Sequence, residues 1–192
     1  MIDSTLSLTG RNGRKINYNR DRNRPDTFQL AKASEVSHIE IERKFLVIAD
    51  TWKSLVTSQC KMKQGYLTDD TNCSLRVRIS DTEAWLNIKS VTVGAQRYEF
   101  EYAIPMLDGE AMLSILSCKP IIEKTRYYVP MHPHIWEIDV FEGDNLGLVV
   151  AEIELDDPDE PFNKPVWLGE EVTFDIRYYN TQLSQNPFKH WF

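Results

Sequence analysis

Residues 39–47 read Ile-Glu-Ile-Glu-Arg-Lys-Phe-Leu-Val, and apolar and charged side chains alternate through the first part of this stretch. Side chains two residues apart on a strand point to the same face. Glu40, Glu42 and Lys44 therefore share one face, and apolar residues dominate the other. This alternation predicts a β-strand that separates an apolar environment from a charged one.

The same alternation recurs along the rest of the chain. It predicts strands at 39–47, 61–68, 73–80, 83–90, 96–104, 121–129, 134–142 and 148–155. Turn-forming residues separate most of these strands, and short helices are expected at 50–58, 106–118 and 177–184. Eight strands with short connections predict a mainly β (α+β) fold, a closed eight-stranded antiparallel barrel with short flanking helices.

The first 37 residues differ from this pattern, because they are rich in Asn, Arg, Asp and Ser and show no sustained period. Such a segment buries too little apolar surface to order, so we expect residues 1–37 to be a disordered extension and 38–192 to be the folded domain. No stretch approaches the ~18 apolar residues of a membrane span. The three cysteines lack metal-ligand spacing, which favours reduced thiols in a cytoplasmic protein.

The charge balance narrows the class of partner. The net charge is −7, which disfavours nucleic acid as a partner. Residues 1–37 hold seven Lys/Arg and four Asp/Glu, which leaves 15 basic and 25 acidic residues in 38–192. If so acidic a domain binds a polyanion, it must do so with metal cations or with a confined set of basic groups.

Charged residues lie on one face of nearly every predicted strand, and on several strands they form pairs of like sign. The pairs are Glu40/Glu42, Arg76/Arg78, Glu99/Glu101 and Glu152/Glu154, and Lys44, Lys89, Arg97, Lys124, Arg126, Glu137 and Asp139 follow the same alternation. A half-solvated sheet would also show charges on one face. Like-signed pairs, however, repel unless something bridges them, and enclosing them in a barrel costs several kcal/mol per ion before pairing. A charged lumen is therefore expected only if it holds an equally charged ligand.

The residue types indicate which ligand. Carboxylate oxygens without His or Cys at ligand spacing select hard cations such as Mg²⁺ or Mn²⁺. Guanidinium groups bind phosphate oxygens in a bidentate manner, and Arg76 and Arg78 place two of them on one face. No Gly-rich phosphate loop is present, so side chains must bind the phosphates. Metal-held carboxylates facing Arg and Lys suit phosphoryl transfer.

Several segments resemble the CYTH superfamily, the triphosphate tunnel metalloenzymes, and its bacterial tripolyphosphatase branch in particular. The matching segments are IEIERKFLV at 39–47, which contains the ExExK signature, KQGYL at 63–67, LRVR at 75–78, YEFE at 98–101, EKTRY at 123–127, EIDVFEG at 137–143, AEIEL at 151–155 and WLGEEVTFDIRYYN at 167–180. One ExExK motif is weak evidence, whereas the ordered set is specific.

The resemblance implies an eight-stranded tunnel that hydrolyses a triphosphate, inorganic tripolyphosphate above others, with metal-activated water attacking the terminal phosphate. It implies two Mg²⁺ or Mn²⁺ ions with substrate bound. The implied metal ligands are Glu40, Glu42, Glu152 and Glu154, with Glu99, Glu101 and Asp139 as further ligands or water-positioning groups. The implied triphosphate ligands are Lys44, Arg76, Arg78, Lys89, Lys124 and Arg126; Lys124 and Arg97 alternatively form ion pairs at the tunnel rim. The four principal carboxylates and Lys44 form the implied catalytic set.

Three alternatives stay open at the level of sequence. A class IV-type adenylate cyclase resembles this barrel, although no residue clearly forms an adenine pocket. A thiamine triphosphatase would need aromatic stacking, for which Trp52, Tyr66 and Trp167 are candidates, though each also suits a core. A non-catalytic polyphosphate or nucleotide binder would not need the acidic set. The expected partner is a small-molecule triphosphate, with no nucleic acid or membrane, and the expected assembly is a monomer or homodimer.

Overall fold

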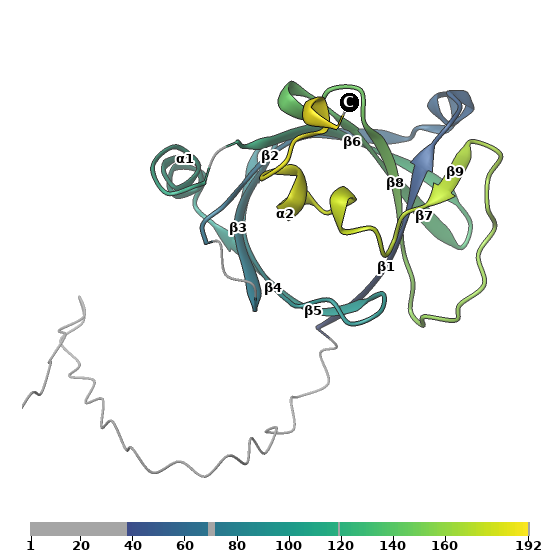
Figure 1. The fold of residues 1–192 in the computed structure, drawn as a ribbon, viewed down its shortest axis with the longest axis horizontal. Helices are drawn as coiled ribbons and strands as arrows, with labels where there is room; N and C mark the ends of the chain where they lie inside the picture. The colour runs from purple at the N-terminus through teal and green to yellow at the C-terminus, as the bar shows by residue number, and fades with distance from the viewer. Residues whose placement is uncertain (1–37, 69–71, 119, 192) are drawn as a thin grey trace, which may run out of the picture. The chain divides into compact units, whose positions relative to one another are not determined.

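The alternating strands close into a barrel in the computed structural model, which describes residues 38–68, 72–118 and 120–191 (Figure 1). The strands are β1 (Ile39–Val47), β2 (Ser58–Tyr66), β3 (Cys73–Ser80), β4 (Glu83–Ser90), β5 (Gln96–Ile104), β6 (Ile122–Met131), β7 (His134–Phe141) and β8 (Val149–Glu154). Their order is β5-β4-β3-β2-β6-β7-β8-β1, all neighbours are antiparallel, and a β5–β1 pairing closes the ring. The predicted mainly β class and eight-stranded barrel are confirmed.

Helices are few and short among the described residues. The helix expected at 106–118 is α1 (Met106–Ile115), and the one expected at 50–58 is a 3₁₀ helix, η1 (Thr51–Leu55). The C-terminal helix expected at 177–184 is divided into η3 (Ile176–Tyr178) and α2 (Asn180–Leu183). Three further elements were not predicted as strand or helix, namely β9 (Leu168–Glu171), which pairs with β1, and the 3₁₀ helices η2 (Gly143–Asn145) and η4 (Phe188–His190). Residues 1–37, predicted to be disordered, lie outside the described part of the chain.

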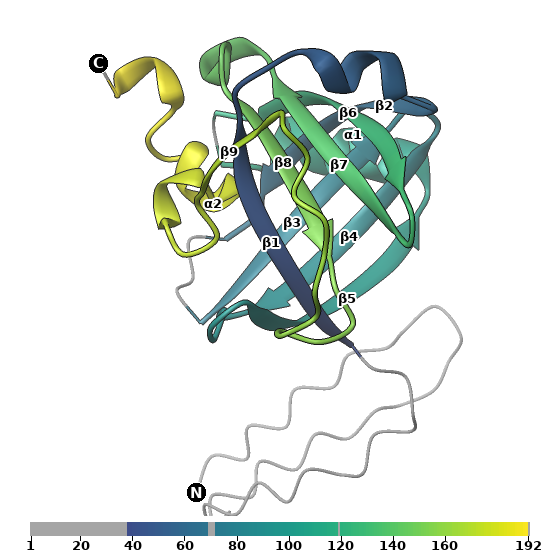
Figure 2. The same ribbon diagram turned by 90° about the vertical axis from the view of Figure 1, so that its right-hand side faces the viewer.

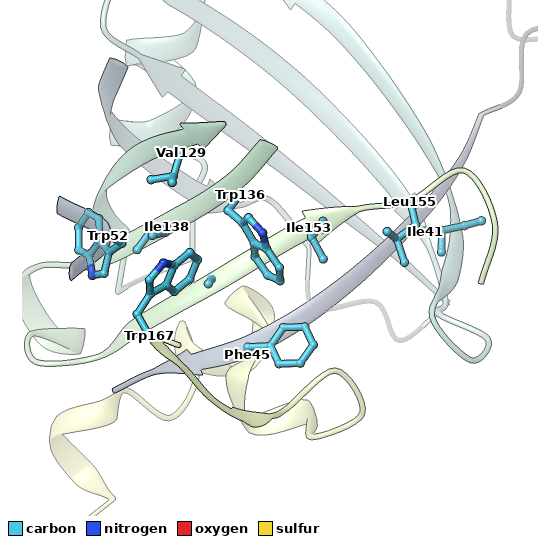
Figure 3. Close-up of a cluster of buried hydrophobic side chains, with 10 residues drawn as sticks. Ile41, Phe45, Trp52, Val129, Trp136, Ile138, Ile153, Leu155 and Trp167 are labelled. Atoms are coloured by element: carbon cyan, nitrogen blue, oxygen red, sulfur yellow. The ribbon is translucent and has the colours of Figure 1, made fainter. Parts of the chain in front are cut away.

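The main apolar core lies on the outside of the barrel wall. Trp136, Phe45 and Ile153 project outward from β7, β1 and β8 and pack beneath Trp167 from the segment that leads into β9 (Figure 3). The rings of Trp136 and Trp167 meet edge to face with centroids 5.5 Å apart. This placement follows from the alternation, since apolar side chains that face outward need a cover and the charged ones then face the lumen.

A second apolar cluster fills one end of the lumen. Ile122, Phe141 and Val150 lie on the inward faces of β6, β7 and β8, and Leu183 of α2 packs against them with no exposed surface. Figure 2 shows the C-terminal segment at this end of the barrel, and Figure 1 shows it across the mouth. The implied tunnel is therefore closed by apolar side chains at this end.

No helix in the described part of the chain is long and apolar enough to span a membrane. No disulfide links Cys60, Cys73 and Cys118, all of which are described.

Candidate active site

The inward faces of all eight strands line one cavity of about 340 Å³. Twelve of the thirteen predicted site residues line it: Glu40, Glu42, Lys44, Arg76, Arg78, Lys89, Glu99, Glu101, Lys124, Arg126, Glu152 and Glu154. Arg97, the rim candidate, lines it as well. Barrel closure and strand alternation bring these residues together although the first and last, Glu40 and Glu154, are more than 100 positions apart in the chain. Asp139 is the exception, because it lies behind the lining with no exposed surface.

Carboxylates gather where β7, β8 and β1 meet. The registers place Glu154 opposite Glu42, and Glu152 opposite both Lys44 and Glu137. Burial raises the pKa of Glu154 to about 7, and the nearby charges of Glu137, Glu40 and Glu42 add to the rise. Glu154 forms no ion pair with the described residues. The cluster thus has more negative charge than its neighbours neutralise.

Lys44 crosses this carboxylate cluster. Its Nζ contacts Glu152 and lies 3.0 Å from Glu42 Oε1. Burial alone would lower the pKa of Lys44, but Glu152 and Glu42 outweigh it, and the pKa is raised. Burial likewise opposes ionisation of Glu152, whereas Lys44, Arg126 and Lys124 hold the pKa of this carboxyl well below its ordinary value. Both groups of the pair are therefore charged at neutral pH.

A second group of ion pairs joins β1, β4 and β5. The carboxylate of Glu40 accepts from Lys89 Nζ at 2.9 Å and from Arg97 Nε at 2.5 Å. Lys89 also lies 2.9 Å from Glu99. Burial, then Arg76 and Arg97, lower the pKa of Lys89. This group therefore pairs Lys89 and Arg97 with Glu40, the carboxylate that precedes Glu42 on the inward face of β1.

Asp139 organises a third group on β6 and β7. Arg126 donates to its two oxygens from Nε and Nη2, each at 2.7 Å, and Lys124 Nζ also contacts it. Burial and the neighbouring charge of Arg126 lower the pKa of Lys124 to about 8. Arg126 also donates to Glu152 at 2.6 Å and contacts Glu137. Asp139 therefore orients two cations whose side chains reach the cavity.

The wall formed by β2 and β3 contains donors rather than carboxylates. Arg76 is 7% exposed, and its ion pair with Glu99 is long, at 3.9 Å. Arg78 lies 2.9 Å from Glu101. Within the described chain, the buried Nε atoms of both arginines and the Nε2 atom of Gln64 have no hydrogen-bond partner. This wall can accept an anion without first breaking many bonds.

The residues suit a hard divalent cation by their chemistry. The donor atoms are carboxylate oxygens, the ligands that Mg²⁺ and Mn²⁺ prefer. In the described residues no three His, Cys, Asp or Glu side chains converge as a metal site, since most of the carboxylates are turned toward Lys or Arg. Glu154 is a carboxylate of the cluster that forms no ion pair with Lys or Arg among the described residues. A cation beside Glu154 and Glu42 would offset the repulsion between them.

The residues missed by the sequence prediction include Gln64 and Glu137, which line the cavity, and Asn87, which is buried on the inward face of β4. Glu137 and Asn87 share the inward alternation that identified the other residues, so this signal was present in the sequence. Asn87 donates to Glu99 and Glu101 and is fully buried. Gln64 has no charge and no charged neighbour two residues away on its strand. Its place in the lumen became visible only in the closed barrel.

Comparison with known proteins identifies the fold family. The sequence-family model described as the CYTH domain matches residues 38–184. An inorganic triphosphatase of Acetivibrio thermocellus is 44% identical over 152 residues, which are 79% of this chain and 97% of that protein. An inorganic triphosphatase of Nitrosomonas europaea is 37% identical over 149 residues, 76% of this chain and 96% of that protein.

A solved structure agrees with these sequence relatives. The crystal structure of the inorganic triphosphatase NE1496 superposes with a TM-score of 0.56 at 34% identity, and the match covers 76% of this chain and 93% of that one. The family model, the relatives and the charged barrel concur, and the chain belongs to the CYTH domain family.

Proposed function

We propose that this protein is a metal-dependent triphosphatase that hydrolyses inorganic tripolyphosphate inside its barrel. The observation that carries the proposal is the lumen, in which a carboxylate cluster faces a wall where Arg76, Arg78 and Gln64 each hold a buried N–H group without a hydrogen-bond partner in the described chain. Two relatives named inorganic triphosphatase, matched over nearly their whole length, support the same activity.

The carboxylates would hold the cations. Glu40, Glu42, Glu152 and Glu154 are the proposed principal ligands for two Mg²⁺ or Mn²⁺ ions, and Glu99 and Glu101 are further ligands or position water. Bound divalent cations supply charge neutralisation at phosphate oxygens and a lowered pKa for bound water. The role of Asp139 as a ligand stays a prediction, and its bonds to Arg126 favour a positioning role instead.

The basic side chains would bind the triphosphate along the lumen. The proposed ligands are Lys44, Arg76, Arg78, Lys89, Lys124 and Arg126. Lys44 and Lys89 form ion pairs with carboxylates that would hold metal. Binding of the cations and the triphosphate together would exchange these partners, so that carboxylates meet metal and ammonium groups meet phosphate.

The lumen supports an inorganic chain over a nucleotide or thiamine ester. Trp52 and Trp167, two candidates for stacking on an organic group, are 2% exposed and belong to the outer core instead. Tyr66 lines the lumen but is buried beside Arg76. A substrate without an organic group therefore fits best. A cytoplasmic location, the absence of a nucleic-acid partner and a monomeric or dimeric assembly stay predictions.

A substrate panel tests the proposal. Tripolyphosphate, ATP and thiamine triphosphate are incubated with Mg²⁺ or Mn²⁺, and released phosphate and cyclic AMP are measured. We expect phosphate release, fastest from tripolyphosphate, and no cyclic AMP. Cyclic AMP would instead support the cyclase, and binding of triphosphate without turnover of any substrate would support the non-catalytic binder.

Replacing one central carboxylate tests the assigned roles. Glu42→Gln removes a charge beside Lys44 and Glu154, and we expect kcat to fall at least about 100-fold with the fold intact by circular dichroism. Glu110→Gln, an exposed position on α1, is the matched control and should keep full activity. Full activity in Glu42→Gln would remove this residue from the site.

A further inference from the structure

Gln64 lies two residues before the end of β2, with its side chain turned into the lumen. It is 1% exposed and lines the cavity together with Met62 and Tyr66, the other inward residues of this stretch. Its Nε2 atom is buried and has no hydrogen-bond partner among the described residues. An amide N–H withdrawn from water without an acceptor is destabilising, so its retention at a fully enclosed position calls for a reason.

Two arginines near Gln64 on this wall also hold buried N–H groups without an acceptor. The register places Gln64 opposite Arg78 on β3, and Arg76 lies one inward position further along β3. The Nε atoms of both arginines are also buried and without a partner in the described chain. Three adjacent side chains thus offer N–H groups, and two carboxylates on β5, Glu99 and Glu101, already accept from Asn87, while Glu101 also accepts from Arg78. The Oδ1 atom of Asn87, opposite Arg76, is a buried acceptor that is likewise without a partner in the described chain. For Gln64 and Arg78, a ligand with several oxygens would supply the acceptors.

The position of Gln64 indicates which part of such a ligand it meets. On its other side Gln64 pairs with Ile122, a member of the apolar cluster that closes the lumen. A phosphate chain that enters from the opposite end would place its deepest phosphate beside Gln64. At this depth an amide supplies a donor without adding another positive charge to a wall that already holds Arg76 and Arg78.

We propose that Gln64 is a substrate-binding residue whose Nε2–H donates to an oxygen of the innermost phosphate of the triphosphate. This inference rests on the proposed function, because it assumes that the lumen receives a triphosphate. The contact is made on binding and involves no reacting group. Its loss should therefore raise KM and leave kcat nearly unchanged.

Gln64→Met tests the proposal, since Met has a similar length and no donor. We expect the KM for tripolyphosphate and the Kd of its non-hydrolysable imido analogue, by calorimetry with Mg²⁺, to rise at least about tenfold. We expect kcat to stay within about twofold and the ligand-free Tm to stay equal or rise, because a buried unpaired donor is removed. Gln59→Met, an exposed position on the same strand, is the control and should leave KM, kcat and Kd unchanged.

Gln64→Glu supplies a second test if the Met variant does not fold. It keeps the size and one oxygen but replaces the donor with a negative charge, so Kd should rise more than in Gln64→Met. Unchanged Kd in either folded variant, or a lower Tm with unchanged Kd, would overturn the proposal and make Gln64 a structural residue. Failure of the proposed function is separable, since it would appear as absent turnover in the unaltered protein, whereas Gln64 is judged by the ratio of Kd values.

Discussion

Asp139 shows how one residue acquires a role from its contacts. Its two oxygens accept from Arg126, Lys124 also contacts it, and none of its surface is exposed. We expect Asp139→Asn to raise the KM for tripolyphosphate because Arg126 and Lys124 lose their anchor. We also expect it to lower the free energy of unfolding by about 3 kcal/mol, as breaking one partner of a buried ion pair does. The Mg²⁺ concentration for half-maximal activity should not change.

The measurements are initial rates over a grid of tripolyphosphate and Mg²⁺ concentrations and urea unfolding curves. Asp144→Asn, which alters an exposed ion pair with Lys189, serves as the control for loss of a carboxylate. It should leave the KM for tripolyphosphate and the free energy of unfolding unchanged. A several-fold higher Mg²⁺ requirement in Asp139→Asn would support the ligand role that the sequence predicts for Asp139.

The charged residues of the lumen could be predicted from the sequence, whereas the neutral residue Gln64 could not. Period-two alternation placed twelve of the thirteen site residues on the cavity surface, because the direction of a side chain on a strand follows from its position. Which carboxylate meets which cation depends on strand order and register, which are long-range properties. Gln64 escaped prediction because an isolated neutral residue does not stand out in a charge pattern.

At the scale of elements, long alternating strands were predicted nearly to the residue, and short ones were not. Four of the predicted ranges, such as 73–80 and 96–104, coincide with the observed strands. In contrast β9 has four residues, Leu-Gly-Glu-Glu, and no alternation. β9 forms because the end of β1 has a free edge on the side opposite β8, and β9 pairs with this edge at Phe45 and Val47. No local sequence pattern reveals such an edge.

The attachment of β9 to β1 depends on an ion pair that pH should weaken. Arg43 donates to both oxygens of Glu171, at 2.5 and 2.6 Å, and these bonds hold the pKa of Glu171 below its ordinary value. We expect Glu171→Gln to lower the free energy of unfolding by about 1 kcal/mol at pH 7. Since the folded-state pKa is depressed, this stabilisation is present above the unfolded-state pKa, about 4.3, and disappears as the pH falls through the folded-state value.

Urea midpoints of the two proteins, measured from pH 7 downward, should therefore converge in acid. Glu170→Gln changes the exposed neighbouring residue of β9 and should track the unaltered protein at every pH. A difference between Glu171→Gln and the unaltered protein that persisted or grew toward acid would exclude the ion pair as its source.

The C-terminal segment is held by burial rather than by helix propensity. α2 has only four residues, too few to be stable alone. Leu183 is fully buried against Ile122, Phe141, Leu148 and Val150 at the closed end of the lumen. We expect Leu183→Ala to lower the free energy of unfolding by about 2–4 kcal/mol through lost burial and a residual cavity. Thermal and urea unfolding measure this, and Leu107→Ala, at a 77% exposed site on α1, should change stability by less than about 0.5 kcal/mol.

The molecule as a whole is arranged with its apolar core outside the barrel and its charges inside. Fold stability and ligand binding are thereby carried by opposite faces of the same strands. Most of the lumen charges form ion pairs with one another, as Lys44 does with Glu152 and Lys89 with Glu40. The outer core, built around Trp136 and Phe45, does not depend on the ligand. Removal of metal should consequently abolish activity without unfolding the protein.

This separation leads to a prediction for thermal unfolding. With chelator the protein should unfold in one cooperative transition, which shows that the outer core suffices. Mg²⁺ with the imido analogue of tripolyphosphate should raise Tm, with a stabilisation of about 2.7 kcal/mol at 100 times Kd. Either component alone should give a smaller shift, because Mg²⁺ alone would leave the buried Nε donors of Arg76 and Arg78 without an acceptor, and the analogue alone would leave Glu154 without a cation. Sodium sulfate at equal ionic strength controls for screening, and an equal shift with sulfate would show that the lumen does not bind the triphosphate specifically.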